Sequence, residues 1–207
     1  SPQQMFGSVA KRTLPGHFDI DRKDLYVVSI MPCTAKKFEA QRHEFSSDGI
    51  QDVDAVLTTK ELGRMIKEAG IAFNELSPGS LDMPMGFKTG AGVIFGNTGG
   101  VSEAVLRYAS EKLTGEVIDN VTFDQVRGLK GIKEANITIG NIELKIAVVH
   151  TLSNAKKIAE QVKTGNCEYD IVEVMACPGG CISGAGQPAS WDSCVTQKRA
   201  EAIYEID

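Results

Sequence analysis

The 207-residue sequence has no long apolar run, no excess of basic residues and few aromatic residues. Its longest apolar stretches, such as Ile146–Val149, are far shorter than the roughly 20 residues that span a bilayer, so we expect no membrane contact. A net charge of −5 argues against nucleic acid as a partner, because phosphate binding requires a basic face. Ser1–Gly7 has no charged segment followed by an apolar one and does not resemble a signal peptide.

The cysteine content indicates metal or redox chemistry in a reducing compartment. Five cysteines, an odd number, argue against a closed disulfide framework. In a chain without a secretory signal, grouped cysteines are typical of metal-binding or redox proteins, so we expect a cytoplasmic protein. The three histidines, His17, His43 and His150, are scattered, and we assign none of them as a ligand.

Short apolar runs alternate with amphipathic stretches, a pattern that favours an α/β fold with mostly parallel sheets flanked by helices. Strands are expected at 25–31, 54–59, 92–96, 121–126, 144–149 and 170–175, and helices at 60–69, 101–113 and 153–163. Ser102 or a neighbour is expected to cap the second of these helices. The Pro- and Gly-rich stretch 74–89 predicts an irregular loop, and we place a possible lobe boundary within 74–92.

Two predicted strands end directly in cysteine motifs, one at Cys33 and one at Cys177-Pro-Gly-Gly-Cys181. Ligand sites gather beyond the carboxyl ends of parallel strands, so both motifs lie where a site is expected. We expect Cys33 at the start of a helix, whose dipole favours the thiolate form. The glycines between Cys177 and Cys181 allow the backbone to approach a large inorganic cluster.

Thiolates at these positions suit an iron–sulfur cluster or zinc. Three simpler interpretations remain open from the residues alone. Cys33 could be an inert buried thiol, and Cys177 with Cys181 could form a redox pair or half of a zinc site. Cys167 and Cys194 fit no motif and are interpreted as bystanders.

The two motifs resemble the cysteine signatures of the iron-only (iron–iron) hydrogenases. Met31-Pro-Cys-Thr-Ala-Lys-Lys-Phe-Glu39 is similar to Met-Pro-Cys-x-x-Lys-x-x-Glu. Residues 173–188 are similar to Glu-x-Met-Ala-Cys-x-x-Gly-Cys-x-x-Gly-x-Gly-Gln-Pro. Segments 54–62, 90–104 and 126–135 also resemble hydrogenase sequence, in the same order. The resemblance covers nearly all of 1–207 and implies the C-terminal part of the catalytic domain, as a fragment of a two-lobed domain.

The resemblance also implies a cofactor, the H-cluster, in which a 4Fe–4S cubane is joined through one cysteine to a diiron unit bearing CO, cyanide and a dithiolate. It implies that Cys33, Cys177 and Cys181 ligate the cubane, with Cys181 as the bridge. Lys36 would pair with a cyanide ligand, whereas Glu39 is expected in an ion pair. The remaining implied cofactor-binding residues line the diiron pocket: Pro2, Gln3, Met31, Phe95 and Met175. Without the resemblance, the two methionines and the phenylalanine would be core residues.

Two departures from the family pattern limit what the chain is expected to do. The first family signature, a Thr-Ser-Cys that supplies the fourth cubane ligand and is followed by a proton-relay cysteine, is absent, so we assign no catalytic residue within 1–207. Family chains also continue beyond Asp207. The segment Ile182–Gln187 has fewer glycines than the family pattern. We therefore expect this fragment to be inactive alone, with the H-cluster absent or incomplete.

The intact parent is then expected to be an anaerobic, ferredoxin-type hydrogenase that interconverts protons plus electrons and molecular hydrogen. Its electrons would come from ferredoxin or another carrier. Non-catalytic relatives that assemble iron–sulfur clusters or act as sensors are the alternatives. The joint presence of the diiron-facing residues favours the enzyme. A nucleotide-binding module at Gly90–Gly96 is disfavoured because the spacing to its third glycine is wrong.

Overall fold

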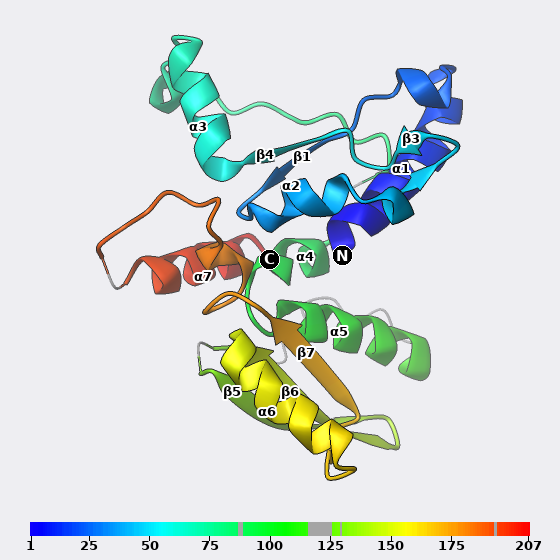
Figure 1. Ribbon diagram of the computed structural model, residues 1–207, viewed down its shortest axis with the longest axis vertical. Helices are drawn as coiled ribbons and strands as arrows, with labels where there is room; N and C mark the ends of the chain where they lie inside the picture. The colour runs from blue at the N-terminus through cyan, green and yellow to red at the C-terminus, as the bar shows by residue number, and fades with distance from the viewer. Residues whose placement is uncertain (87–88, 116–125, 129, 193) are drawn as a thin grey trace. The chain divides into compact units, whose positions relative to one another are not determined.

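The computed structural model describes residues 1–86, 89–115, 126–128, 130–192 and 194–207. The chain divides into two compact units. Unit 1 comprises Ser1–Phe87 and Gly184–Ala189, and unit 2 comprises Lys88–Ser183 and Ser190–Asp207. Each unit contains a parallel strand pair and several helices (Figure 1), which confirms the expected α/β class.

Unit 1 is built on two parallel strands, β1 (Val28–Met31) and β4 (Ala55–Thr58). The other elements of this unit are α1 (Pro2–Phe18), η1 (Arg22–Asp24), α2 (Ala35–Ala40), η2 (His43–Phe45), β2 (Ser46–Ser47), β3 (Ile50–Gln51), α3 (Thr59–Glu68) and η3 (Phe73–Glu75). The antiparallel β2 and β3 form a short hairpin. A small core of Ala40, Val53 and Val56, against which Val27 and Met31 pack, joins α2 to the strands.

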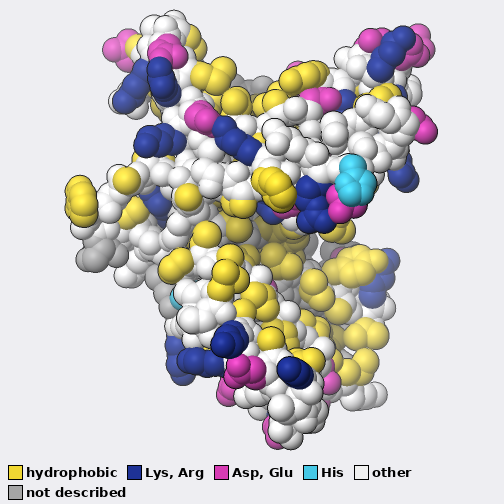
Figure 2. Space-filling model, viewed as in Figure 1, with side chains coloured by type: hydrophobic (Ala, Val, Ile, Leu, Met, Phe, Trp, Pro, Cys, Tyr) yellow, Lys and Arg dark blue, Asp and Glu magenta, His cyan; other side chains and the backbone are white. Residues whose placement is uncertain are grey.

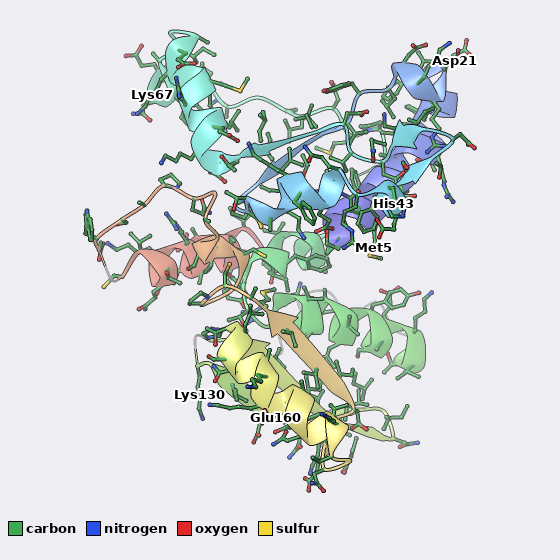
Figure 3. All side chains as sticks on the ribbon, in the orientation of Figure 1. Met5, Asp21, His43, Lys67, Lys130 and Glu160 are labelled. Carbon is green, nitrogen blue, oxygen red and sulfur yellow. The ribbon has the colours of Figure 1, made fainter. Side chains whose placement is uncertain are left out.

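The helix α3 follows β4 without a loop because Thr58 and Glu61 form a capping box. The Thr58 hydroxyl accepts the Glu61 N–H at 3.1 Å, and the Glu61 carboxylate accepts the Thr58 N–H at 2.8 Å. Hydrogen bonds from Lys37 and from Thr58 lower the pKa of Glu61 to about 2. Charged side chains of both signs cover the outer face of α3 (Figure 2), and Lys67 is labelled on this helix in Figure 3.

Unit 2 contains a three-stranded sheet in the order β5 (Ile132–Ile139), β6 (Ile142–His150), β7 (Ile171–Met175). β5 and β6 are antiparallel, whereas β6 and β7 are parallel and are connected by α6 (Leu152–Lys163). Successive residues of β6 alternate between two cores. Ile146 and Val148 belong to a core that includes Leu106 of α5 (Gly100–Thr114), whereas Ala147 and Val149 belong to one that includes Ile158 of α6.

Several expected elements are present and others differ. The expected helices at 60–69, 101–113 and 153–163 are confirmed, as are the strands at 54–59, 144–149 and 170–175. The expected strand at 25–31 begins only at Val28, and the cap residue of α5 is Gly99 rather than Ser102. The helices α1 and α7 (Val195–Ile206) and the strand β5 were not expected. Of the expected strand at 121–126, all but its last residue lies outside the described residues.

The expected strand at 92–96 is wrong. This segment forms the short helix α4 (Gly90–Val93) followed by the 3-10 turn η4 (Ile94–Gly96). Ile94 is fully buried, and a short buried apolar run has the same composition whether it is helical or extended. Within the described part of the chain, no helix is both long and apolar enough to cross a bilayer.

Candidate metal centre

Cys33 of unit 1 follows β1 directly, and its side chain is half-buried. The helix α2 begins at Ala35 with Thr34 as its N-cap, so Cys33 lies two residues before the first helical residue. The parallel neighbour β4 ends at Thr58, which pairs with Met31. Cys33 therefore lies just beyond the carboxyl ends of two parallel strands, as its motif predicts.

The segment Gly184–Ala189 supports the backbone at Cys33. Gly186 donates its N–H to the Pro32 carbonyl at 3.0 Å and accepts the Lys60 N–H at 3.0 Å. A Cβ atom at Gly186 would lie 2.7 Å from the Cys33 nitrogen, a distance that real Cβ contacts do not reach. Only glycine permits this approach, so the residues that follow Cys181 in the sequence help to fix the strand end that carries Cys33.

Lys36 is half-buried in the first turn of α2 and is held by Glu39. The Lys36 ammonium donates to one Glu39 carboxylate oxygen, and the Ser1 hydroxyl donates to the other. Burial by itself would raise the pKa of Glu39, but the hydrogen bonds from Lys36 and Ser1 outweigh it and lower the pKa below its ordinary value. The expected ion pair of Glu39 is confirmed, with Lys36 as its partner.

Gln3 is a buried residue in the first turn of α1, whereas the neighbouring Pro2 is exposed. The Gln3 amide donates to the Lys36 carbonyl at 3.4 Å and accepts the Ser29 hydroxyl at 2.9 Å. Both ends of this side chain therefore hold α1, β1 and α2 together. Met31, the last residue of β1, packs against the unit 1 core.

Cys177 and Cys181 of unit 2 lie on one turn that begins two residues after β7. The turn is closed by a hydrogen bond from the Gly180 N–H to the Cys177 carbonyl at 3.1 Å, and the 3-10 helix η6 (Cys181–Ser183) follows. Gly179 has φ 77° and Gly180 has φ 95°, a backbone conformation that favours glycine. Both cysteines are half-buried, while the two glycines are buried.

Gly180 makes close contacts with its surroundings. A Cβ atom there would lie 2.6 Å from the Thr98 nitrogen, 2.9 Å from the Gly96 carbonyl oxygen and 2.9 Å from the Met175 sulfur. The Thr98 N–H donates to the Gly179 carbonyl at 3.2 Å. Met175, at the end of β7, and Phe95, in η4, belong to the elements that surround this turn. Met175 is 9% exposed and Phe95 is half-buried.

Two buried polar residues near this turn were not identified as site residues from the sequence. Glu173, on β7, accepts the Gly99 N–H at 2.6 Å and the Ser102 N–H at 2.7 Å, so it caps the start of α5. His150, on β6, accepts the Gly179 N–H at its Nδ1 atom at 3.2 Å. Both side chains meet partners at long sequence separation, and no local pattern signals such contacts. The exposed His43, labelled in Figure 3, is adjacent to Glu44 and far from any cysteine in sequence.

The donor set and the backbone fit an iron–sulfur cluster. Cys33, Cys177 and Cys181 are half-buried thiols on well-anchored turns, and thiolates are the preferred ligands of such clusters. On the second turn, the buried Gly179 and Gly180 pack against the protein, and the two cysteines on either side of them stay half-buried. Beside it the Thr98 hydroxyl, on a residue 2% exposed, has no hydrogen-bond partner among the described residues. In the described part of the chain, no three His, Cys, Asp or Glu side chains converge on a single metal ion, and no disulfide is present.

Cysteine thiols at strand ends of an α/β scaffold suit a domain of the iron–sulfur type. Residues 1–185 match the iron only hydrogenase large subunit, C-terminal domain, and the chain belongs to that family. The family and the fold predicted from the cysteine motifs are thereby confirmed.

Known proteins similar to this chain include hydrogenases and assembly factors. A periplasmic Fe hydrogenase large subunit from Nitratidesulfovibrio vulgaris is 50% identical over 91% of this chain and 45% of its own length. Iron hydrogenase 1 from Clostridium pasteurianum is 46% identical over 91% of this chain and 33% of its own length. Cytosolic iron-sulfur assembly component 3 from Mus musculus is 36% identical over 100% of this chain and 45% of its own length. The chain thus spans less than half of each of these relatives.

Solved structures similar to this chain include FeFe-hydrogenases. A FeFe-hydrogenase whose oxygen inactivation begins with modification and degradation of the H cluster 2Fe subcluster has a TM-score of 0.80 and 40% identity. This chain covers 59% of that structure, which in turn covers all of this chain. An apo FeFe-hydrogenase from Chlamydomonas reinhardtii has a TM-score of 0.80 and 42% identity over 99% of this chain and 58% of its own.

Proposed function

We propose that the intact protein is a ferredoxin-type hydrogenase that reversibly interconverts protons plus electrons and molecular hydrogen at an H-cluster. The observation that carries this proposal is the Cys177–Cys181 turn, which holds two half-buried thiols on an anchored backbone just beyond the end of β7. The higher identity to hydrogenases than to the assembly factor, 50% against 36%, supports the enzyme over its non-catalytic relatives.

In this proposal Cys33, Cys177 and Cys181 would hold a 4Fe–4S cubane, and Cys181 would also link it to the diiron unit. When bound, the H-cluster supplies the stored electrons and the open metal position that hydrogen chemistry requires. The protein orients and shields it. The family resemblance assigns five residues to the diiron unit: Pro2, Gln3, Met31, Phe95 and Met175. Of these, Met31, Phe95 and Met175 would supply the apolar and sulfur-bearing side chains that keep a metal site dry.

In this proposal Lys36 pairs with an anionic cyanide ligand of the diiron unit. Glu39 and the buried amide of Gln3 control where Lys36 lies, through the carboxylate and through the Lys36 carbonyl. A cation held by one carboxylate can turn to a second anion without losing all its pairing, which suits an ammonium that must meet a cluster ligand.

A second function has one observation in its favour. The mouse cytosolic iron–sulfur assembly component covers the whole chain at 36% identity. A non-catalytic assembly relative would bind an iron–sulfur cluster but no diiron unit with CO and cyanide. Infrared spectra of the full-length, matured protein separate the two functions, because only the hydrogenase would show bands of metal-bound CO and cyanide. Absence of these bands would favour the assembly function.

The first experiment tests the ligands in the chain itself. The 207-residue chain, reconstituted anaerobically with iron and sulfide, is expected to bind about four iron atoms as a cubane with three protein thiolates. Serine at Cys33, Cys177 or Cys181 is expected to remove most of this iron. Serine at Cys167 or Cys194, the matched controls, is expected to leave it unchanged. Equal loss at all five positions would contradict the assignment.

The second experiment tests the chemistry. With only three thiolates in the matching motifs, the chain alone is expected to evolve no hydrogen from a chemical one-electron reductant. The full-length, matured protein is expected to do so. Substantial hydrogen turnover by the loaded chain would refute the proposed need for a fourth ligand and a proton-relay cysteine.

Partners and compartment follow the same proposal. Protons and hydrogen are the substrates, and ferredoxin or another one-electron carrier is the electron partner. We propose neither a nucleic acid nor a membrane partner. The cytoplasmic location stays a prediction, because the similar hydrogenase from Nitratidesulfovibrio vulgaris is periplasmic.

A further inference from the structure

His150 is a buried histidine that the proposed chemistry does not use. It is the last residue of β6, is 7% exposed, and pairs in register with Met175 of β7. Its Nδ1 atom accepts the N–H of Gly179, the middle residue of the Cys177–Cys181 turn, at 3.2 Å. An imidazole nitrogen can accept only through its lone pair, so this contact requires the ring to carry no proton on Nδ1.

A second hydrogen bond holds the turn at Gly179. The Thr98 N–H donates to the Gly179 carbonyl at 3.2 Å, so both polar backbone groups of Gly179 have protein partners. The Gly179 N–H is thereby used by the imidazole. This N–H belongs to the middle residue of the turn, and with the imidazole as its acceptor it is not free to donate elsewhere.

The backbone around His150 is itself firmly held. The His150 N–H donates to the Gly131 carbonyl at 3.0 Å, and the His150 carbonyl accepts the Asn154 amide at 3.1 Å. The next residue, Thr151, has φ 75° and donates its N–H to the Met175 carbonyl at 2.9 Å. A non-glycine residue in this region is strained and persists only where the surroundings enforce it. The strained residue, Thr151, directly follows His150 at the end of β6.

We propose that His150 is a positioning residue for the metal centre: its Nδ1 atom fixes the Cys177–Cys181 turn through Gly179 and keeps that N–H away from the cluster. Hydrogen bonds from N–H groups to cluster sulfur stabilise the reduced cluster and raise its reduction potential. Withholding one donor therefore lowers the potential. This effect on potential rests on the proposed cluster, whereas the effect on the turn does not.

The substitutions separate the acceptor from the bulk of the side chain. His150→Asn keeps an acceptor, the Oδ1 atom, at the position of Nδ1. His150→Leu keeps comparable volume without any acceptor, and His150→Phe keeps a planar ring without any acceptor. If the leucine variant does not fold, the phenylalanine variant takes its place in every comparison.

The first measurement uses the chain without a cluster. Hydrogen exchange of the Gly179 amide is expected to be slow in the wild-type and asparagine chains. It should be about tenfold faster in the leucine variant, as for the loss of one buried hydrogen bond. Equal exchange in all the chains would overturn the inference. If the reconstituted wild-type chain binds no iron–sulfur cluster, the proposed ligand set fails, but this exchange comparison still decides the role of His150.

The second measurement uses the chain loaded with iron and sulfide. The midpoint potential of the cluster is expected to be more positive in the leucine variant and to return toward the wild-type value in the asparagine variant. A role confined to packing would lower the stability of both variants and leave the potential and the electron paramagnetic resonance spectrum unchanged. That result would overturn the proposed withholding of the N–H.

Discussion

The substitution Gly180→Ala tests the Cys177–Cys181 turn most directly. The added Cβ would lie 2.6 Å from the Thr98 nitrogen and 2.9 Å from the Gly96 oxygen, both backbone atoms that cannot rotate away. Relieving that overlap costs about 1–3 kcal/mol. Breaking the neighbouring bond between the Thr98 N–H and the Gly179 carbonyl costs about 1 kcal/mol more. The positive φ of 95° adds about 1 kcal/mol.

These contributions sum to a loss of about 4 kcal/mol in the free energy of unfolding. Gly165→Ala is the matched control, because Gly165 has φ 72° but a Cβ there would meet nothing within 4 Å. The control should therefore lose only about 1 kcal/mol, the cost of the backbone conformation alone.

Urea unfolding followed by far-ultraviolet circular dichroism is the assay. The single tryptophan, Trp191, is fully exposed, so its fluorescence would report little of this change. The chain has two units, so the transition must first be tested for a single step with a second probe. If the two variants lose the same stability to within about 0.5 kcal/mol, the close contacts assigned to Gly180 are refuted.

Three further predictions concern buried or strained groups. Glu173→Gln is expected to lose about 2 kcal/mol of stability in the same assay. The carboxylate of Glu173 accepts the N–H groups of Gly99 and Ser102, whereas the NH₂ of a glutamine would face one of these donors and could not accept it. A loss under about 0.5 kcal/mol would contradict this role. Thr151→Gly is expected to stabilise the chain by about 1 kcal/mol by relieving a φ of 75°, and a lower melting temperature would count against the strain. Glu39 has a lowered pKa in the folded chain, so its ionisation stabilises above its unfolded value of about 4.3 and is lost as the pH falls through the folded value. The stability difference between wild type and Glu39→Gln should shrink on acidification through that range, and a difference independent of pH would contradict the ion pair with Lys36.

The elements that the sequence predicted correctly are those with strong local patterns. The helix at 60–69 has an apolar stripe and a capping box at Thr58, and the strands at 144–149 and 170–175 are dense in β-branched residues. The strand predicted at 92–96 was wrong because burial, rather than a strand periodicity, accounts for the apolar residues there. The sequence correctly placed Cys33 near a strand end. It did not predict that Cys33 lies two residues before the first residue of α2.

The cysteine motifs, the family and the α/β class were determined by the sequence alone, since each depends on residue types at short and fixed spacing. The tertiary structure decided which distant groups support those motifs. Gly186 reaches the Cys33 backbone, Glu173 reaches the start of α5, and His150 reaches Gly179. These contacts join residues 29 to more than 150 positions apart. The sequence holds no local signal for them, because their energy comes from burying polar groups that the fold first brings together.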